Sequence, residues 1–309
     1  GYDHMKGIRV LSLLDKDTNS KIGKKSAPAD ITLYSYKQGD IAVEIIEPTL
    51  YPEKVQPLVF GLCLADFVVF RPDTSKKEFG EILAALIISG KPGAFVGDRG
   101  AVEPYIKGSS LEKWETLEDD PIAIRERMVS VQNNWKDGKV KIVVDQVFSL
   151  KSIGVVVLGA ISRGTIKVHD DLLIFPPKMA VSVKSLQLHD ANVPEISDGS
   201  RVGANIKGAE AESIHRGFIL GEDILSGKSI AAELYCPQFI KDGLKKDAKV
   251  FAYLGLHFCE ATLGDDLGAG QKKKIEITCA EEAAYENGDL IFIVDPGRKP
   301  RIMAAGRIQ

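Results

Sequence analysis

The sequence predicts an α/β unit followed by two all-β units, each folded as a small barrel. Two observations indicate this order. From residue 6 to residue 101, apolar runs of strand length alternate with segments of helical spacing, which is typical of a sheet with helices on both faces. After Gly138 the pattern changes to short strands roughly every 8–12 residues with glycine between them, which is typical of sandwiches and barrels. The predicted boundaries are 1–138, 139–227 and 228–309.

In the first unit, strands alternate with helices, so we expect parallel pairing of the central strands. Strands are predicted at 8–14, 31–36, 41–46, 65–70 and 92–96. Helices are predicted at 52–64 and 75–88, and the second of them ends at Gly90. Residues 110–131 are expected to form one helix or two, interrupted near Pro121.

The remaining residues contain two series of six short strands. In the first series the predicted strands are 140–148, 153–161, 165–175, 179–189, 201–207 and 216–220. In the second they are 230–235, 249–256, 259–263, 273–279, 290–294 and 300–308. Two successive barrels after an α/β unit make a restrictive architecture.

The charge balance and the length of the apolar runs limit the partners that the chain is expected to bind. The chain has 309 residues with 40 Lys+Arg and 43 Asp+Glu, a net charge of −3, and the excess of acids lies wholly within residues 1–138. The neutral barrels argue against a large basic nucleic-acid surface and leave room only for a local patch. No apolar run approaches the length of about 18 residues that spans a membrane, so neither a membrane nor a DNA partner is expected.

Cysteine usage and the first residues bear on location. The four cysteines are at least 20 positions apart, and no C-x-x-C pair exists. This removes the usual zinc spacings and predicts reduced cysteines in a cytoplasmic protein without a metal site. Residues 1–4 are interpreted as an appended segment before a native Met5, with no signal segment after it.

A glycine-punctuated run at 154–172 carries the most specific motif. It resembles the opening of the second domain of translational GTPases, G-x-V-x-x-G-x-[IV]-x-x-G-x-[IV]-x-x-G-D-x-[LV], with His169-Asp170 in place of Gly-Asp. Further matches to that domain are V-K-S-L-Q at 183–187, D-G-S-R-V-G at 198–203 and R-G-F-I-L at 216–220. Residues 301–308 resemble the strand that ends the third domain of EF-Tu, with Ala304 where glycine is usual. The chain therefore resembles EF-Tu and the archaeal type of selenocysteine-specific elongation factor.

This resemblance implies a GTPase domain of the P-loop class in residues 1–138, and it can be tested on the motif G-x-x-x-x-G-K-[ST]. That motif wraps the β-phosphate in backbone N–H groups and supplies a hydroxyl to Mg²⁺. In the matching window, 18–25, only Gly23 and Lys24 survive, while Thr18 and Lys25 replace the first glycine and the metal ligand. The alternative interpretation is a polar loop and helix start with a solvated lysine cluster.

Two further nucleotide motifs and one switch are missing. After the strand at 41–46, where D-x-x-G is expected, residues 47–50 are E-P-T-L, and proline supplies no N–H. After the strand at 92–96, where N-K-x-D reads guanine, residues 97–100 are G-D-R-G. The interval between Gly23 and Ile31 is too short for a first helix and a switch I segment. We therefore expect a truncated GTPase-like fold that has lost GTP binding and hydrolysis, with no catalytic residue and no cofactor.

The resemblance also implies partners. In the family, the two barrels hold the acceptor and T stems of tRNA, so we expect binding of tRNA, the ribosome or a translation-associated protein. The candidate contact residues are Arg201, Arg216, Phe218, Lys272, Lys273 and Lys274. Arg216 and Phe218 could line the aminoacyl-adenosine pocket, or they could be barrel-corner and core residues. The three lysines could contact phosphate, or they could blunt strand edges.

Two alternative functions remain open from the sequence. The chain could be a working GTP hydrolase with divergent motifs that delivers aminoacyl-tRNA with GTP and Mg²⁺ bound at Gly23 and Lys24. It could also be a protein–protein adaptor that uses the GTPase-like remnant as its interaction surface.

Overall fold

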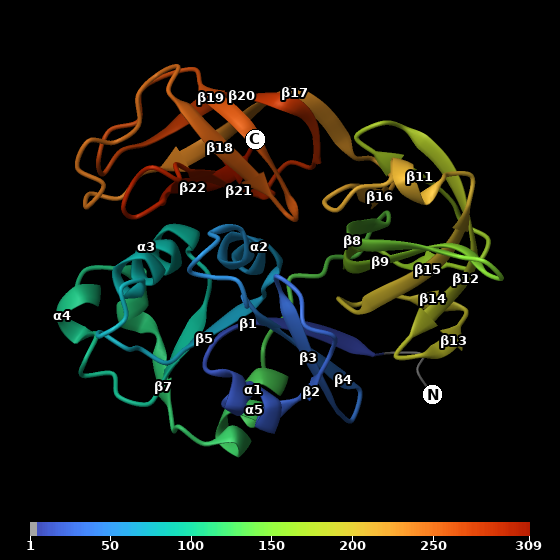
Figure 1. Ribbon diagram of the computed structural model, residues 1–309, viewed down its shortest axis with the longest axis horizontal. Coiled ribbons are helices and arrows are strands. Elements are labelled where there is room, and N and C mark those ends of the chain that lie inside the picture. The colour runs from blue at the N-terminus through green and yellow to red at the C-terminus, as the bar shows by residue number, and fades with distance from the viewer. Residues whose placement is uncertain (1–4) are drawn as a thin grey trace.

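The computed structural model describes residues 5–309, in which three bodies each contact the other two (Figure 1). They are an α/β unit (β1 to α5), a middle barrel (β8 to β16) and a C-terminal barrel (β17 to β22). The predicted fold class is therefore confirmed. The interpretation of residues 1–4 lies outside the described part of the chain.

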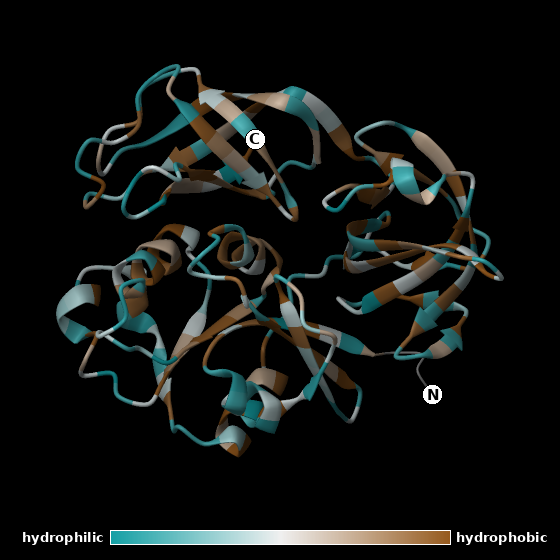
Figure 2. Cartoon of the chain, in the orientation of Figure 1, coloured by the Kyte–Doolittle hydropathy of each residue, from teal (hydrophilic) through white to brown (hydrophobic). Residues whose placement is uncertain are grey.

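The α/β unit is built on a seven-stranded sheet with the order β2-β3-β4-β1-β5-β6-β7. The strands from β4 through β1, β5 and β6 to β7 pair in parallel, and β3 pairs with β4 in the antiparallel sense. The strands are β1 (Lys6–Leu13), β2 (Lys24–Lys25), β3 (Thr32–Gln38), β4 (Ile41–Glu47), β5 (Phe67–Phe70), β6 (Gly93–Val96) and β7 (Glu115–Leu117). The central strands are hydrophobic along their length, as Figure 2 shows, because helices cover both faces.

Helices α2 and α3 cover the face of this sheet that points toward the C-terminal barrel, whereas α1 and α5 cover the opposite face (Figure 1). The helices are α1 (Lys16–Ile22), α2 (Gln56–Leu64), α3 (Phe79–Ser89), α4 (Glu103–Ile106) and α5 (Pro121–Val129), with a 3-10 turn η1 at Ser110–Lys113. The expectation of helix throughout 110–131 is wrong in its first half. Residues Glu115–Leu117 form β7, a strand too short and too polar to show alternation.

The middle barrel is a closed ring of six strands, because β11 pairs with both β16 and β12. The ring strands are β8 (Lys141–Leu150), β9 (Gly154–Arg163), β11 (Asp171–Phe175), β12 (Met179–Leu188), β15 (Arg201–Lys207) and β16 (Ile219–Gly221). The short strands β10 (Ile166–Lys167), β13 (Ala191–Val193) and β14 (Glu195–Ile196) and the 3-10 turn η2 (Ala211–Ser213) lie outside it.

One predicted strand of the middle barrel, 165–175, is divided into β10 and β11 by a turn at His169. His169 has φ of 76°, the left-handed conformation that glycine adopts at least cost. The Oδ2 atom of Asp170 accepts a hydrogen bond of 2.8 Å from the Lys167 N–H and holds the turn. The turn therefore keeps its shape without the glycine that the family motif usually has there.

The C-terminal barrel closes in the order β17-β20-β19-β18-β21-β22. Its strands are β17 (Leu225–Tyr235), β18 (Lys249–Leu254), β19 (His257–Leu263), β20 (Lys272–Tyr285), β21 (Leu290–Val294) and β22 (Ile302–Ile308). One hydrophobic core runs from β1, α2 and α3 of the α/β unit into this barrel, and it includes Phe60, Leu86, Tyr253 and Phe292. The α/β unit and the C-terminal barrel are therefore joined by buried apolar surface.

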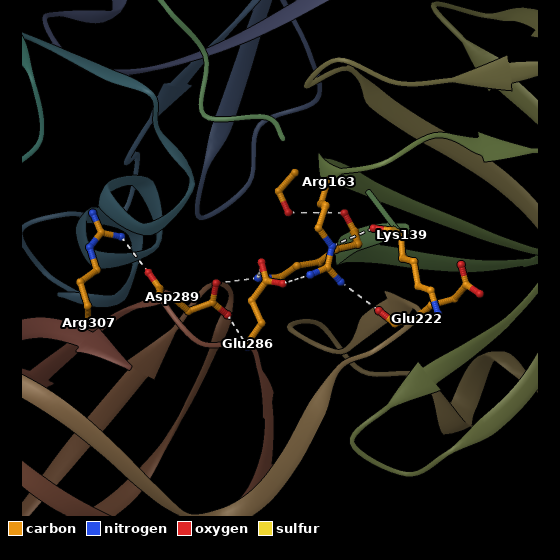
Figure 3. A network of polar contacts seen from close by, with 9 residues as sticks. Lys139, Arg163, Glu222, Glu286, Asp289 and Arg307 are labelled. Carbon is orange, nitrogen blue, oxygen red and sulfur yellow. Dashed lines mark hydrogen bonds and ion pairs between the residues drawn. The ribbon is translucent and has the colours of Figure 1, made fainter. Parts of the chain in front are cut away.

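The two barrels are joined by ion pairs around the loop between β20 and β21 (Figure 3). Lys141 Nζ lies 3.0 Å from Glu286 Oε1 and 2.6 Å from Asp289 Oδ1, and its side chain is almost fully buried. Arg163 pairs with Glu286 as well and donates to the Glu222 carbonyl at 2.9 Å. Breaking a buried pair of this kind is costly because it leaves an uncompensated charge.

Candidate functional site

A cleft of the α/β unit lies at the carboxyl ends of β1, β4 and β5, where open α/β sheets bind their ligands. It has a volume of about 620 Å³. Its walls carry the apolar side chains of Leu13, Leu14 and Phe79 beside the charged side chains of Asp15, Glu47, Arg71 and Lys76. In a P-loop protein, this is the place of the nucleotide phosphates.

The connection from β1 to α1 is too short to wrap a phosphate, since only Leu14 and Asp15 separate the strand from the helix. The Asp15 carboxylate accepts a hydrogen bond of 2.8 Å from the Thr18 N–H and another of 2.9 Å from the Thr18 hydroxyl. The carboxylate thus accepts from the N–H group that an anion would otherwise bind at the start of the helix. Partial burial opposes its ionisation, but the Thr18 hydrogen bonds and Arg71 lower the pKa of Asp15 below its usual value.

Arg71, which follows β5, fixes Asp15 in place. Its guanidinium pairs with Asp15, lies 3.0 Å from Asp119 Oδ2 through Nε, and donates from Nη2 to the Thr18 hydroxyl at 3.1 Å. The chain therefore fills the phosphate end of the cleft with its own ion pairs.

The surviving pair Gly23-Lys24 is not on this connection. Gly23 caps the end of α1, and Lys24 is an exposed residue of β2 opposite Ser35. Both therefore follow the first helix, whereas a phosphate loop precedes it. The correspondence of 18–25 with a phosphate loop is wrong, because α1 begins at Lys16, before the window.

Glu47 stands where the D-x-x-G aspartate is expected, at the end of β4, and it serves the fold. It is buried and accepts hydrogen bonds from Asn19 Nδ2 at 3.1 Å, from the Tyr34 hydroxyl at 3.3 Å and from the Thr49 hydroxyl at 3.2 Å. At the end of β6, the Asp98 carboxylate accepts from the Gly100 N–H at 2.8 Å. Both carboxylates thus accept hydrogen bonds from other groups of the chain.

A second pocket, here named the junction pocket, lies where the three bodies meet and has a volume of about 440 Å³. The residues that line it are Asp30, Lys54, Gln56, Pro57, Phe60, Arg216, Leu256, His257, Phe258 and Glu281. Phe258 is 37% exposed; its ring stacks on Tyr253, with centroids 5.0 Å apart and 11° between the planes, and lies 5.9 Å from the Phe60 ring. The pocket therefore has a supported aromatic floor.

Polar groups with spare hydrogen-bonding capacity surround this floor. The Nε2 atom of His257 is buried, with no hydrogen-bond partner among the described residues. Helix α2 begins at Gln56 with no side-chain cap from Val55, and its second residue, Pro57, has no N–H group. The Arg216 guanidinium lies over the Phe60 ring at 5.1 Å and 2.7 Å from Asp30 Oδ2. A planar group carrying acceptors would suit such a pocket.

The predicted contact residues are distributed over three places. Arg201 and Arg216 meet in a cleft of about 280 Å³ between the α/β unit and the middle barrel, where each pairs with Asp145, at 3.0 and 3.3 Å. Phe218 packs against the core of the middle barrel, with His215 edge-on at 5.2 Å. It does not line the junction pocket.

The three lysines lie at the start of β20, apart from the junction pocket. Lys272 pairs with Glu233 at 3.1 Å, and Lys273 pairs with Asp265 at 2.9 Å. Lys274 is exposed and has no ion pair with any residue in 5–309.

Sequence reasoning missed the aromatic floor. Phe60 belongs to α2 of the α/β unit, whereas Tyr253 and Phe258 face each other on β18 and β19 of the C-terminal barrel, so no local motif contains all three. The single available signal was a large aromatic residue at an outward-facing strand position, Phe258, between the inward-facing His257 and Cys259.

Comparison with known proteins agrees with this architecture. Residues 154–221 match the family model of elongation factor Tu domain 2. The uncharacterized protein MJ0325 of Methanocaldococcus jannaschii is 35% identical over 315 residues, which cover 99% of this chain and 97% of that protein. The selenocysteine-specific elongation factor of the same organism is 34% identical over 126 residues, 40% of this chain and 27% of the factor. The crystal structure of elongation factor SelB from Methanococcus maripaludis in its apo form has a TM-score of 0.81 at 19% identity, covering 99% of this chain and 80% of that chain.

The α/β unit, the barrel motif and these similarities define a translational GTPase-like protein of the archaeal selenocysteine-factor type. Within that class, the chain belongs to the same family as MJ0325 of Methanocaldococcus jannaschii. The resemblance inferred from the sequence is thus confirmed. Within residues 5–309, no helix is both long and apolar enough to cross a membrane, and no three of the His, Cys, Asp and Glu side chains are grouped to hold a metal ion.

Proposed function

We propose that this protein is a translation factor-like RNA-binding protein that works without GTP, and that it receives the end of an RNA such as tRNA in the junction pocket. The observation that carries the loss of GTP chemistry is the Asp15 carboxylate at the start of α1. The carboxylate accepts from the Thr18 N–H that a P-loop would offer to a phosphate, and Arg71 is already paired with Asp15 and Asp119. A nucleotide would therefore find neither a free N–H group of Thr18 nor an unpaired arginine at this position.

Titration with a fluorescent GTP analogue and Mg²⁺ tests this part of the proposal. We expect no saturable binding in the micromolar range, because neither a phosphate loop nor its lysine is present. Micromolar binding to the wild-type protein would refute the loss of GTP binding, and its abolition by Lys24→Ala would place the nucleotide at Gly23-Lys24. Circular dichroism of both proteins controls for folding.

Support for RNA comes from the aromatic floor of the junction pocket. Stacking of a base on an exposed aromatic ring contributes about 1–3 kcal/mol, and it tolerates any base. Phe258 is 37% exposed and its ring stacks on Tyr253, so the ring is ordered before a base binds.

Filter binding at low salt, with tRNA and with a short single-stranded RNA, tests the RNA part. We expect Phe258→Ala to weaken binding by about 5- to 150-fold, which corresponds to the lost stacking energy. Phe239→Ala is the matched control, since Phe239 is an equally exposed aromatic residue of the C-terminal barrel, 43% against 37%, that does not line the pocket. Failure of tRNA and of ribosomes to bind, or equal binding by Phe258→Ala and the wild type, would refute the proposal.

The charges that line the pocket predict how RNA binding depends on salt concentration. Lys54 and Arg216 are offset by Asp30 and Glu281, so the pocket can neutralise one or two phosphates at most. The logarithm of the binding constant should therefore fall with the logarithm of salt concentration with a slope of only about −0.7 to −1.4 for single-stranded RNA. A steep slope would locate the RNA on a different, basic surface.

A further inference from the structure

Two buried thiol groups lie together inside the C-terminal barrel, on the neighbouring strands β19 and β20 (Figure 1). Cys259 and Cys279 are 3% and 2% exposed, and both side chains belong to the hydrophobic core of this barrel. Cys279 pairs across the ladder with Ala261, which is two residues beyond Cys259 on the same face of β19. The two thiols are close enough for the Cys279 S–H group to donate a hydrogen bond to the Cys259 sulfur.

A bulge in β20 surrounds the Cys259 sulfur with further donors. Between two successive ladder pairs with β17, a single residue lies on β17, Lys228, whereas residues 279–282 lie on β20. The Glu281 N–H group, within this bulge, hydrogen-bonds the Cys259 sulfur, and so does the His257 side chain. Bulges redirect side chains and are frequent beside functional sites. Three donors from two strands therefore converge on one sulfur atom.

These surroundings give the two thiols different protonation states. Hydrogen bonding from Cys279 holds the pKa of Cys259 below its ordinary value, although burial opposes this, and His257 and the Glu281 N–H group lower the pKa further. The pKa of Cys279 is raised, because its hydrogen bond to Cys259 and its burial both favour the protonated form. Cys236 is equally buried in the same core, and burial raises its pKa to about 11. Since the thiolate is the nucleophilic form of cysteine, Cys259 is the activated thiol of this core.

The junction pocket reaches the same end of the barrel. His257 shares one face of β19 with Cys259 and lines that pocket together with Glu281. The Nε2 atom of His257 is buried and has no hydrogen-bond partner within residues 5–309. The ring that hydrogen-bonds the Cys259 sulfur is thus also a wall of the pocket, and a small polar reactant there is one side chain away from the sulfur.

We propose that Cys259 and Cys279 form a redox-active dithiol, which a small hydroperoxide such as hydrogen peroxide oxidises to a disulfide. The Cys259 thiolate attacks one oxygen of the peroxide and the O–O bond breaks, which leaves a sulfenic acid on Cys259 and releases hydroxide that takes a proton from solvent. The Cys279 sulfur then displaces the hydroxyl group of the sulfenic acid, and this group leaves with the Cys279 proton as water. The two sulfur atoms together lose two electrons, which the peroxide oxygens gain, and an added thiol such as dithiothreitol reverses the reaction.

Peroxide treatment of the whole 309-residue chain, followed by iodoacetamide and peptide mapping without reductant, tests the dithiol. We expect one linked pair of peptides, which contain Cys259 and Cys279. Ellman titration of the unfolded product should show the loss of two of the four thiols, and dithiothreitol should restore both. Cys279→Ala should stop at a sulfenic acid on Cys259 that dimedone traps, and Cys259→Ala should leave Cys279 reduced.

The matched control is Cys236→Ala, because that thiol is as buried in the same barrel and has no thiol partner among the described residues. This variant should leave the rate of thiol loss unchanged. In the wild-type protein the rate should change by less than about threefold between pH about 6 and about 8, because Cys259 is already a thiolate. A thiol with the ordinary pKa of about 8.5 would slow by roughly 50- to 100-fold over the same interval.

Three outcomes would overturn the proposal. The first is no loss of thiol at peroxide concentrations that oxidise free cysteine. The second is oxidation of Cys236 as fast as that of Cys259, which would mean that the barrel must open before either thiol reacts. The third is a sulfinic acid on Cys259 without a disulfide, which would mean that Cys279 does not reach it. The peptide map and the pH profile use the wild-type protein, so they decide the question even where a variant fails to fold.

Discussion

Replacement of Gly7 by alanine tests the closest approach between the α/β unit and the middle barrel. A Cβ atom on Gly7 would lie 2.4 Å from the Gly199 carbonyl carbon and 2.5 Å from the Ser200 nitrogen, both of them backbone atoms that cannot rotate away. Gly7 itself lies in β1 and does not need a left-handed φ, so alanine causes no backbone strain there. The cost of the substitution is therefore the separation of the two bodies.

The magnitude follows from the hydrogen bonds at that contact. Separation breaks the bond from the Gly7 N–H to the Asp198 carbonyl, the bond from Asn133 Nδ2 to the Asp198 carbonyl at 3.1 Å, and the bond from Arg9 Nη1 to the Gly199 carbonyl at 2.8 Å. Two neutral buried bonds and one from a charged donor together contribute about 4 kcal/mol. Replacing glycine by alanine lowers the conformational entropy of the unfolded chain, and this stabilises the folded state by at most about 1 kcal/mol. We expect a net loss of about 3 kcal/mol in the free energy of unfolding.

Urea denaturation followed by tryptophan fluorescence measures this loss. Trp114 is buried in the α/β unit, and Trp135 Nε1 donates to the Gly164 carbonyl of the middle barrel at 2.9 Å. Each of the two bodies that meet at Gly7 therefore has its own fluorescent probe. Gly80→Ala in α3 is the matched control. No atom lies within 4 Å of a Cβ at Gly80, so alanine there should raise stability by up to about 1 kcal/mol. If Gly7→Ala unfolds within about 1 kcal/mol of the wild type, the contact does not hold the bodies together.

Three further outcomes are expected. Burial lowers the pKa of Lys91 to about 8 in the folded state, against about 10.4 in the unfolded chain, so the unfolded state binds more protons between these values. Stability measured in urea should therefore rise with pH from about 8 to about 10, and Lys91→Met should flatten that rise; a parallel pH profile would contradict the assignment. Phe292→Ala should cost about 3–5 kcal/mol and lower the thermal midpoint of the α/β unit as well as that of the C-terminal barrel, because the ring belongs to their shared core; loss confined to the barrel would count against a shared core. Lys141→Met should lower the urea midpoint by the equivalent of about 3 kcal/mol, since it leaves the Asp289 carboxylate without its cationic partner inside the barrel–barrel contact; an unchanged midpoint would mean that the carboxylates are solvated.

Local sequence patterns predicted the elements that are long and regular. The strands of β1, β4 and β5 and the helix α3 lie where apolar periodicity placed them, because each buries its own continuous apolar face. The strand β7 was missed because it has three residues and two of them are exposed. The position of α1 was missed because the helix is seven residues long and polar, so its start is set by the Asp15 cap more than by periodicity.

The predicted contact residues show the limit of this reasoning. Arg201 and Arg216 were predicted from a motif to contact RNA, and that role stays a prediction; the motif did not indicate that both pair with Asp145, or that they pair with Glu44 and Asp30 of the α/β unit. A motif specifies which residue is present, whereas the partner of a charged side chain depends on which chain segments fold against it. Lys272 and Lys273 are paired with acids of their own barrel for the same reason.

By itself, the sequence determined the class of the protein. Turn glycines and strand spacing are properties of neighbouring residues, and they define two barrels after an α/β unit. The tertiary structure alone decided that Asp15 pairs with Arg71 at the start of α1, that Phe60 and Phe258 form the floor of a pocket, and that Arg301 pairs with Glu81. These contacts join residues as far as 220 positions apart, and they depend on how the three bodies pack together, which no local sequence pattern specifies.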